Sequence, residues 1–200
     1  THIRHSEKVF NMKRLILILI ITLSFQSWTI ADDIRDFEIE GMSIGDSLLD
    51  HFSQTEIINA KTNWFKDKSY SISNNLKSNN FQTYEIIQAA YKTVDKKYIL
   101  EGIEGYQFFS KNKINECFKV QDNIISTFND LFTNVNGGKK KTFDHPDPDN
   151  HSIVTNVSFI FDNGNKVMVG CVEGKDKTSD LRVILRTKEY SFFINHKAYK

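Results

Sequence analysis

Ser47 is the side chain whose setting most directly suggests chemistry, because it lies in the run Gly45-Asp46-Ser47-Leu48. A catalytic serine needs a histidine to accept its proton and a carboxylate to orient that histidine. The histidines after residue 31 are His51, His145, His151 and His196, and the residues three positions before them are Leu48, Thr142, Pro148 and Phe193. None of the latter four is an acid, so the sequence contains no Asp-x-x-His pair to complete the set.

The same four letters resemble the signature of the GDSL family of serine esterases. This resemblance implies that Ser47 is a nucleophile and that the fold is a parallel α/β sandwich. The family's Gly-x-Asn-Asp block, which helps to form an oxyanion hole, does not occur here. A structural interpretation explains the run as well, since Ser43 can cap a short helix and Asp46 in its first turn favours the helix dipole. A serine hydrolase acting through Ser47 is therefore an alternative function.

The acidic loop 144–151 is a second candidate site. Its carboxylates and histidines, which two prolines interrupt, are Asp144, His145, Asp147, Asp149 and His151. Alternating carboxylates suit calcium and histidines suit zinc, but the central glycine and distal glutamate of a calcium loop are missing. A polar connector before a strand explains the same composition. We expect no metal cofactor and keep a ligand- or metal-binding loop as an alternative.

Three aromatic residues, Trp64, Phe65 and Tyr70, lie in a polar segment. They could form a platform that binds a sugar or a lipid headgroup, or they could pack onto the core from its periphery. Two arginines, Arg182 and Arg186, share one face of an expected strand, and we expect them on the solvent side of the sheet.

Charge does not favour a nucleic-acid partner. The whole chain has a formal net charge of +1, and the only basic run, at 139–141, follows two glycines in an expected loop. Nucleic-acid binding requires a concentrated basic face. We therefore interpret this run as a solvated loop.

Residues 12–31 have the pattern of a secretory signal peptide. Met12-Lys13-Arg14 forms a positive start, an apolar run follows, and small residues precede a cleavage point at Ala31. The apolar run is shorter than the roughly 20 residues of a membrane-spanning helix. We expect residues 1–11 to be an upstream extension and residues 32–200 to form one exported domain without a transmembrane segment. Its expected location is the periplasm or the cell exterior.

Two cysteines, Cys117 and Cys171, follow the leader. A lone pair in a chain bound for an oxidising compartment is usually a disulfide, and we predict one here. Two independent buried thiols are the alternative.

The hydrophobic pattern predicts an α+β domain with an antiparallel sheet of about five strands, one short helix and one long helix. The expected order is helix, two strands, helix, three strands. The short helix begins at Ser43, with a further helical turn near 56–58, and the long helix covers 112–134. The strands are expected at 81–92, 98–109, 153–161, 166–173 and 181–187. Gly102 and Gly105 predict a bulge or a close approach in the second strand.

Asn163-Gly164 predicts a tight hairpin between two of these strands. A two-residue turn there places Phe161 opposite Lys166 and Phe159 opposite Met168. Cys171 then points to the other face of the sheet from Phe159. A helix that carries Cys117 would have to cover that other face, or the register would have to shift.

The run at 32–50, DDIRDFEIEGMSIGDSLLD, directly follows the leader. It resembles the mature start of small exported bacterial proteins of unknown function and, over fewer residues, envelope domains of the outer-membrane assembly lipoprotein type. The first resemblance implies export and brings no activity or site residues. Because no catalytic set is complete, we expect a non-catalytic binding or accessory domain. Its expected partner is an envelope protein or a small ligand.

Overall fold

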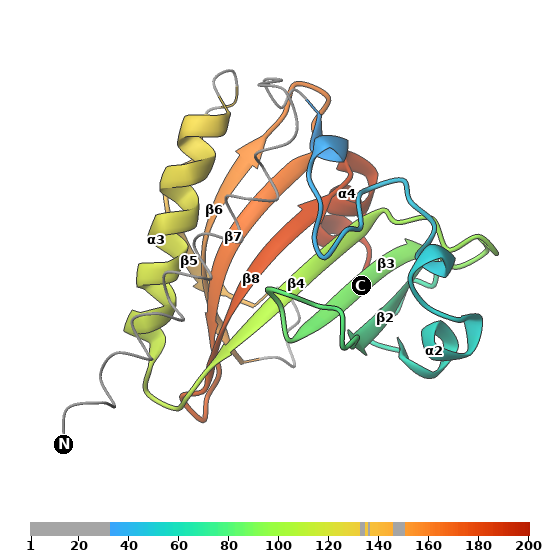
Figure 1. Cartoon of the computed structure of the whole chain (residues 1–200), viewed down its shortest axis with the longest axis horizontal. Coiled ribbons are helices and arrows are strands. Elements are labelled where there is room, and N and C mark those ends of the chain that lie inside the picture. The colour runs from blue at the N-terminus through green and yellow to red at the C-terminus, as the bar shows by residue number, and fades with distance from the viewer. Residues whose placement is uncertain (1–32, 133–134, 136, 146–150) are drawn as a thin grey trace. The chain divides into compact units, whose positions relative to one another are not determined.

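Eight strands form one antiparallel sheet (Figure 1). The computed structural model describes residues 33–132, 135, 137–145 and 151–200. The strands are β1 (Lys61–Thr62), β2 (Tyr70–Leu76), β3 (Ile86–Lys92), β4 (Gly102–Phe109), β5 (Lys141–Asp144), β6 (Ile153–Ile160), β7 (Lys166–Glu173) and β8 (Ser179–Arg186). Their spatial order is β1-β2-β3-β4-β8-β7-β6-β5, so two four-stranded meanders meet where β4 pairs with β8.

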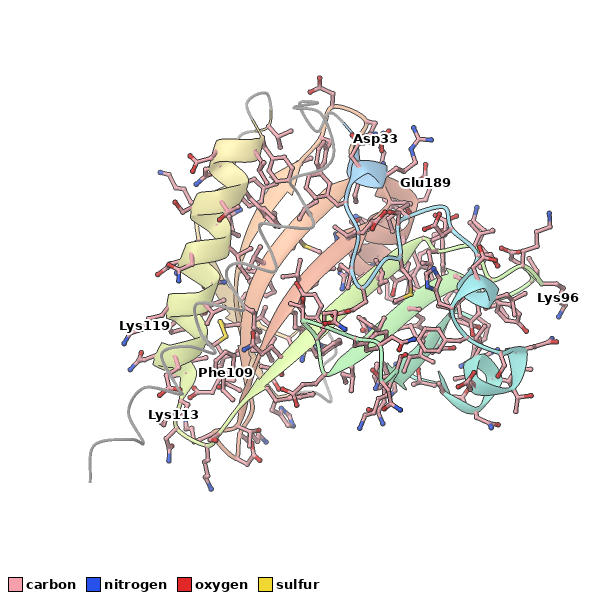
Figure 2. The ribbon with its side chains drawn as sticks, in the orientation of Figure 1. Asp33, Lys96, Phe109, Lys113, Lys119 and Glu189 are labelled. Atoms are coloured by element: carbon pink, nitrogen blue, oxygen red, sulfur yellow. A yellow bond between two sulfur atoms is a disulfide. The ribbon has the colours of Figure 1, made fainter. Side chains whose placement is uncertain are left out.

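The described residues also form three α-helices, α2 (Gln54–Asn59), α3 (Ile114–Leu131) and α4 (Lys188–His196). The long helix α3 crosses β7 and β8 on one face of the sheet, and α4 packs on the other face (Figure 1). We call these the α3 face and the α4 face. Figure 2 shows the side chain of Lys119 on the outer side of α3 and that of Lys113 at the N-terminal end of the helix. The predicted α+β class is confirmed, whereas the expected counts of about five strands and two helices are too low.

The sequence pattern did not predict three of the strands, β1, β2 and β5, or the helix α4. β2 contains buried serines, and the Ser73 hydroxyl donates to the Ile57 carbonyl at 2.7 Å and lies 2.9 Å from the Tyr91 hydroxyl. β1 has only two residues, and all four residues of β5 are exposed, so neither strand shows an alternating pattern. The helix α4 begins at Thr187, whose side chain accepts a hydrogen bond from the Tyr190 amide at 3.1 Å.

The short helix expected from Ser43 is a single 3-10 turn, Leu48–Asp50, that begins later. Asp46 does not support a helix from Ser43, because its carboxylate accepts a hydrogen bond from the Ser43 amide at 2.7 Å and closes a turn. The further helical turn near 56–58 is present as α2. Ser53 and Glu56 cap α2 reciprocally, each accepting a hydrogen bond from the other's backbone amide.

The register expected for the β6–β7 hairpin is wrong by one residue. Phe159 lies opposite Val167, and Thr155 lies opposite Cys171. The reason is a turn longer than the expected two residues, in which the Phe161 amide donates to the Asn165 carbonyl at 3.0 Å and Gly164 has a φ of 85°. Because cross-strand neighbours point to the same side, Cys171 shares the α3 face with Phe159.

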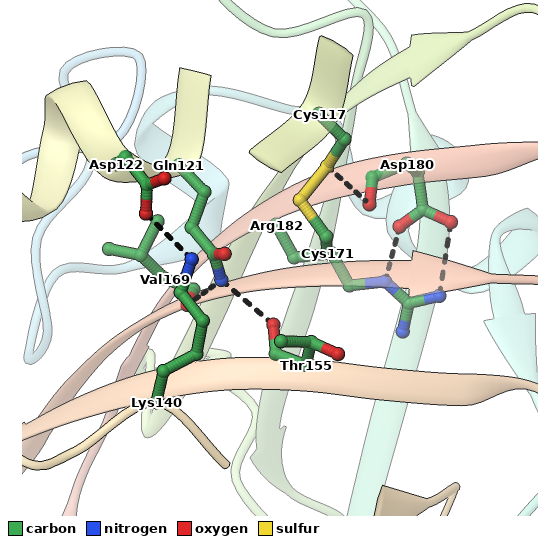
Figure 3. Close-up of a disulfide and its surroundings, with 9 residues drawn as sticks. All are labelled: Cys117, Gln121, Asp122, Lys140, Thr155, Val169, Cys171, Asp180 and Arg182. Carbon is green, nitrogen blue, oxygen red and sulfur yellow. Dashed lines mark hydrogen bonds and ion pairs between the residues drawn. A yellow bond between two sulfur atoms is a disulfide. The ribbon is translucent and has the colours of Figure 1, made fainter. Parts of the chain in front are cut away.

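The predicted disulfide is confirmed: Cys117 of α3 is bonded to Cys171 of β7 (Figure 3), with the two Cα atoms 6.1 Å apart. One helical turn further on, the buried Gln121 amide donates to the carbonyls of Thr155 at 2.8 Å and Val169 at 2.9 Å. A covalent bond and two hydrogen bonds therefore hold α3 across β6 and β7.

The close approach expected at Gly102 and Gly105 is confirmed on both sides of β4. A Cβ atom at Gly102 would lie 2.6 Å from the ring of Tyr190, and one at Gly105 would lie 2.6 Å from the ring of Tyr84. Each glycine thus makes room for an aromatic ring to lie directly on the backbone of the sheet.

We expect loss of the disulfide to lower the free energy of unfolding by about 4 kcal/mol, because the bond closes a long loop in the unfolded chain. The two bonded cysteines are separated by 54 residues. The measurement is urea unfolding of the native protein with and without reductant. A Cys117→Ala/Cys171→Ala variant is the control, and reductant should leave its unfolding midpoint unchanged. Two titratable thiols in untreated native protein would contradict the prediction.

Candidate functional site

Ser47 serves as the N-cap of the 3-10 turn Leu48–Asp50. Its hydroxyl oxygen accepts a hydrogen bond from the Leu49 amide at 3.2 Å, and its hydroxyl donates to the Lys97 carbonyl at 2.7 Å. The Ser47 proton is therefore directed at a carbonyl and not at a histidine. The antiparallel sheet also differs from the parallel sandwich that the GDSL resemblance implies. In this geometry Ser47 joins the segment before α2 to the segment before β4.

The acidic loop is only partly described. Asp144 ends β5 and is exposed, the His145 amide donates to the Ser152 carbonyl at 2.9 Å, and His151 is exposed. Asp147 and Asp149 lie outside the described residues. Within the described part of the chain, no group of three or more histidine, cysteine, aspartate or glutamate side chains is placed to hold a metal ion.

The three aromatic residues at 64–70 do not form a common platform. Phe65 and Tyr70 are buried beneath α4, with ring centroids 5.0 Å and 4.7 Å from that of Phe193. Burial raises the pKa of Tyr70 to about 12, and the charges of nearby glutamates add to the effect. Trp64 alone is substantially exposed, at 49% of its surface. Two of the three rings therefore belong to the core.

A cavity of about 170 Å³ lies beside these rings, where the chain leaves β1 and returns in β2. Its polar lining includes Lys61, Lys68, Ser71 and Thr93. The hydroxyls of Ser71 and Thr93 are 2.8 Å apart, and the Lys68 ammonium donates to the Phe65 carbonyl at 2.6 Å. The cavity is smaller than the usual 300–1,000 Å³ of a ligand site, so it has room only for a small polar group.

Arg182 and Arg186 do not lie on a solvated surface, which corrects the expectation from the sequence. Both are four-fifths buried on the α4 face, where Arg186 pairs with Glu104 and Arg182 pairs with Asp180 at 2.5 Å. Each guanidinium also lies over an aromatic ring: Arg182 is 4.8 Å from the centre of Tyr106, and Arg186 is 5.7 Å from that of Tyr190.

Glu104 is the centre of this charge cluster. Burial works to raise the pKa of its carboxyl, but the charges of Arg186 and Arg182 outweigh burial and hold that pKa below its usual value. The Tyr106 hydroxyl donates to Glu104 and to Gln88, at 3.1 Å each. Burial, and then the Glu104 charge, raise the pKa of Tyr106 well above its ordinary value. Two arginines face two acids, so the cluster has no unmatched positive charge for an anionic ligand.

The sequence predicts this charge cluster only if the pairing of β4 with β8 is already known. Glu104 is the one charged residue of β4, and it lies opposite Ile184, between the two arginines of β8. A buried acid predicts a nearby cation. Without the pairing of β4 with β8, which are about 80 residues apart, the arginines alone resemble solvent-facing residues.

The fold and the charge cluster define an α+β domain with one antiparallel sheet and a closed, neutral group of buried charges. The sequence matches no protein-family model and has no significant match among curated proteins. No helix within the described ranges is long and apolar enough to cross a membrane.

We expect Glu104→Gln to lower the free energy of unfolding at pH 7 by about 3 kcal/mol, because it leaves a buried arginine charge unpaired. The native carboxylate has a depressed pKa, so its stabilisation is present above the unfolded value of about 4.3 and is lost as pH falls through the folded pKa. The difference between wild type and variant should therefore shrink in acid. The measurement is urea unfolding across this pH range.

The matched control for this variant is Glu116→Gln. Glu116 pairs with Lys113 at 2.5 Å, but both side chains are about half exposed. An exposed pair contributes about 0–1 kcal/mol, so this variant should unfold almost as wild type does. Equal losses in the two variants would contradict a special role for Glu104.

We expect Ser47→Ala to cost about 1 kcal/mol of stability through the lost cap and the lost bond to the Lys97 carbonyl. Thermal unfolding measures this loss. Ester hydrolysis by the wild type, if it is detected, should persist in the variant, because the Ser47 hydroxyl is held in a structural role. Saturable ester turnover that disappears in Ser47→Ala would instead establish the serine hydrolase.

Proposed function

We propose that this protein is a non-catalytic binding or accessory domain that is exported to the periplasm or cell envelope. The Cys117–Cys171 disulfide supports export, because such bonds persist in oxidising compartments and are rare in the cytosol. The leader pattern at 12–31 and the resemblance of residues 32–50 to small exported proteins point the same way. Cleavage near Ala31 is part of this proposal.

The observation that carries a binding role is a set of large apolar side chains exposed on the α4 face. Phe108, Phe143 and Ile160 are 47%, 42% and 53% exposed. Phe143 and Phe108 lie at the two ends of one cross-strand row, with Val154, Val172 and Asp180 between them. Exposed apolar groups near polar ones are typical of surfaces that bind another protein. The Ser47 hydroxyl and the ion pairs of Glu104 with Arg186 and of Asp180 with Arg182 are structural contacts, which favours binding over catalysis.

A small ligand is the second candidate partner, and the cavity between β1 and β2 is the observation that favours it. Its lysines and hydroxyls suit a small anionic or hydroxylated group. Such a ligand would raise the melting temperature, and Lys61→Ala should abolish the rise. Metal binding by the 144–151 loop would show as a change in melting temperature with calcium, zinc or chelator.

We expect Phe108→Ser to weaken capture of an envelope partner without unfolding the protein. The measurement is crosslinking mass spectrometry on the tagged chain in its native envelope, with the wild type and the variant compared side by side. Phe192→Ser is the matched control, because Phe192 is 53% exposed, similar to the 47% of Phe108, but lies on α4. A partner that both variants capture equally would remove the α4 face from the proposal. Absence of any enriched partner would favour the small ligand.

A further inference from the structure

The strand β5 forms one edge of the sheet, and its outer side has no partner strand among the described residues. Its four residues, Lys-Thr-Phe-Asp, are all exposed. The inner side pairs with β6 over the whole strand, from Lys141 opposite Asn156 to Asp144 opposite Ile153. Such an edge offers backbone donors and acceptors to another strand.

The hydrogen-bond phase of the β5–β6 pair determines which residues face outward. The His145 amide donates to the Ser152 carbonyl at 2.9 Å, and these two residues continue the register of the pair. Hydrogen-bonded pairs alternate along an antiparallel ladder, so Phe143 and Lys141 also bond inward to β6. The amides and carbonyls of Thr142 and Asp144 therefore point to the open edge.

A second copy of β5 can join this edge antiparallel about a two-fold axis at an outward-facing residue, which then forms a hydrogen-bonded pair with its counterpart, or at an inward-facing residue, which forms a non-hydrogen-bonded pair. An axis at Lys140, Lys141 or Asp144 would place a charged residue opposite itself, and an axis at Phe143 would pair two phenylalanines and bring no opposite charges together. Like charges directly opposite each other are destabilising. An axis at Thr142 instead places Lys140 opposite the second copy's Asp144, twice. One register is therefore electrostatically favoured over its neighbours.

We propose that two copies of this chain pair edge to edge through β5, in the antiparallel register centred on Thr142, and form one continuous sheet. Thr142 of each copy then exchanges both backbone hydrogen bonds with its counterpart. Lys140 faces Asp144 across the junction on the α3 face. On the α4 face, the Lys141 side chain lies against the exposed ring of Phe143, in the closer, non-hydrogen-bonded type of pair.

The fold leaves room for this arrangement. The helix α3 packs on β7 and β8, so five strand spacings separate β7 of one copy from β7 of the other. At about 4.8 Å a spacing, the two helices are about 24 Å apart, beyond the 8–10 Å of contacting helices. Lys140 directly precedes β5, and its ammonium already pairs with Asp122 of α3 at 2.6 Å. In the dimer this ammonium therefore has to bond both Asp122 and the second copy's Asp144, for which its three donors suffice. Pairing through β5 needs no envelope partner. A test of this dimer is therefore independent of a test of the proposed binding function.

The test is a charge exchange followed by sedimentation equilibrium of the purified protein. Asp144→Lys and Lys140→Asp should each raise the dimer dissociation constant about tenfold or more, since each places like charges opposite one another at two points. An equimolar mixture of the two variants should form heterodimers, because both contacts then join opposite charges. Lys96→Asp is the matched control, since Lys96 lies exposed in the turn between β3 and β4, several strands away from β5, and it should dimerise as wild type does.

A second variant tests the register without a change of charge. Thr142→Cys should crosslink to its counterpart on mild oxidation, because directly opposed Cα atoms in this pair type lie about 5.5 Å apart, within disulfide range. Asp144→Cys should not crosslink, because its two copies would be about 14 Å apart. A wild type that stays monomeric at the highest attainable concentration would overturn the proposal. So would a dimer that survives both charge variants unchanged.

Discussion

The bond between Cys117 and Cys171 joins the only long helix of the described chain to a strand near the middle of the sheet, and much of the core depends on this junction. With α3 held there, its later turns bring Phe132 within 5.1 Å of Phe159, ring centre to ring centre. Phe37 then packs 4.9 Å from Phe132, so the segment before the first strand is fixed through α3. The same segment is attached to the sheet by Glu40, whose carboxylate accepts hydrogen bonds from the amides of residues 82–84 at 2.7–2.8 Å.

The α4 face is organised by charge rather than by a covalent tie. Glu104, Arg186 and Tyr106 are matched to one another at the centre of the sheet, where β4 and β8 join the two meanders. A buried charge without a partner is strongly destabilising, so this group disfavours any other pairing of the two strands. The α3 face therefore contributes most of the apolar burial, whereas the α4 face specifies which strands lie side by side.

The parts of this fold that sequence reasoning could predict are those with a strong local pattern. Hydrophobic periodicity was enough to predict the long helix and the strand at 166–173. The expected oxidising compartment was enough to predict the disulfide. The register of the β6–β7 hairpin depended on the length of one turn, and a single residue moved Cys171 to the other face. β2 and the setting of Arg186 were missed because their polar groups are satisfied by residues from other parts of the chain. The Gly-Asp-Ser-Leu run drew attention to Ser47, but the sequence did not predict its structural role. The carbonyl that accepts its hydrogen bond belongs to Lys97, 50 residues away.

The two edges of the sheet are unequal, and this bears on how large an assembly the domain can build. At the far edge, β1 pairs over only two residues before the chain turns away to line the cavity. That edge is too short to extend a sheet, whereas β5 presents four consecutive residues. A protein with one extendable edge can close a pair but cannot propagate a fibre. In the proposed dimer, the short β1 strands at the two outer edges would therefore favour a closed pair over a growing fibre.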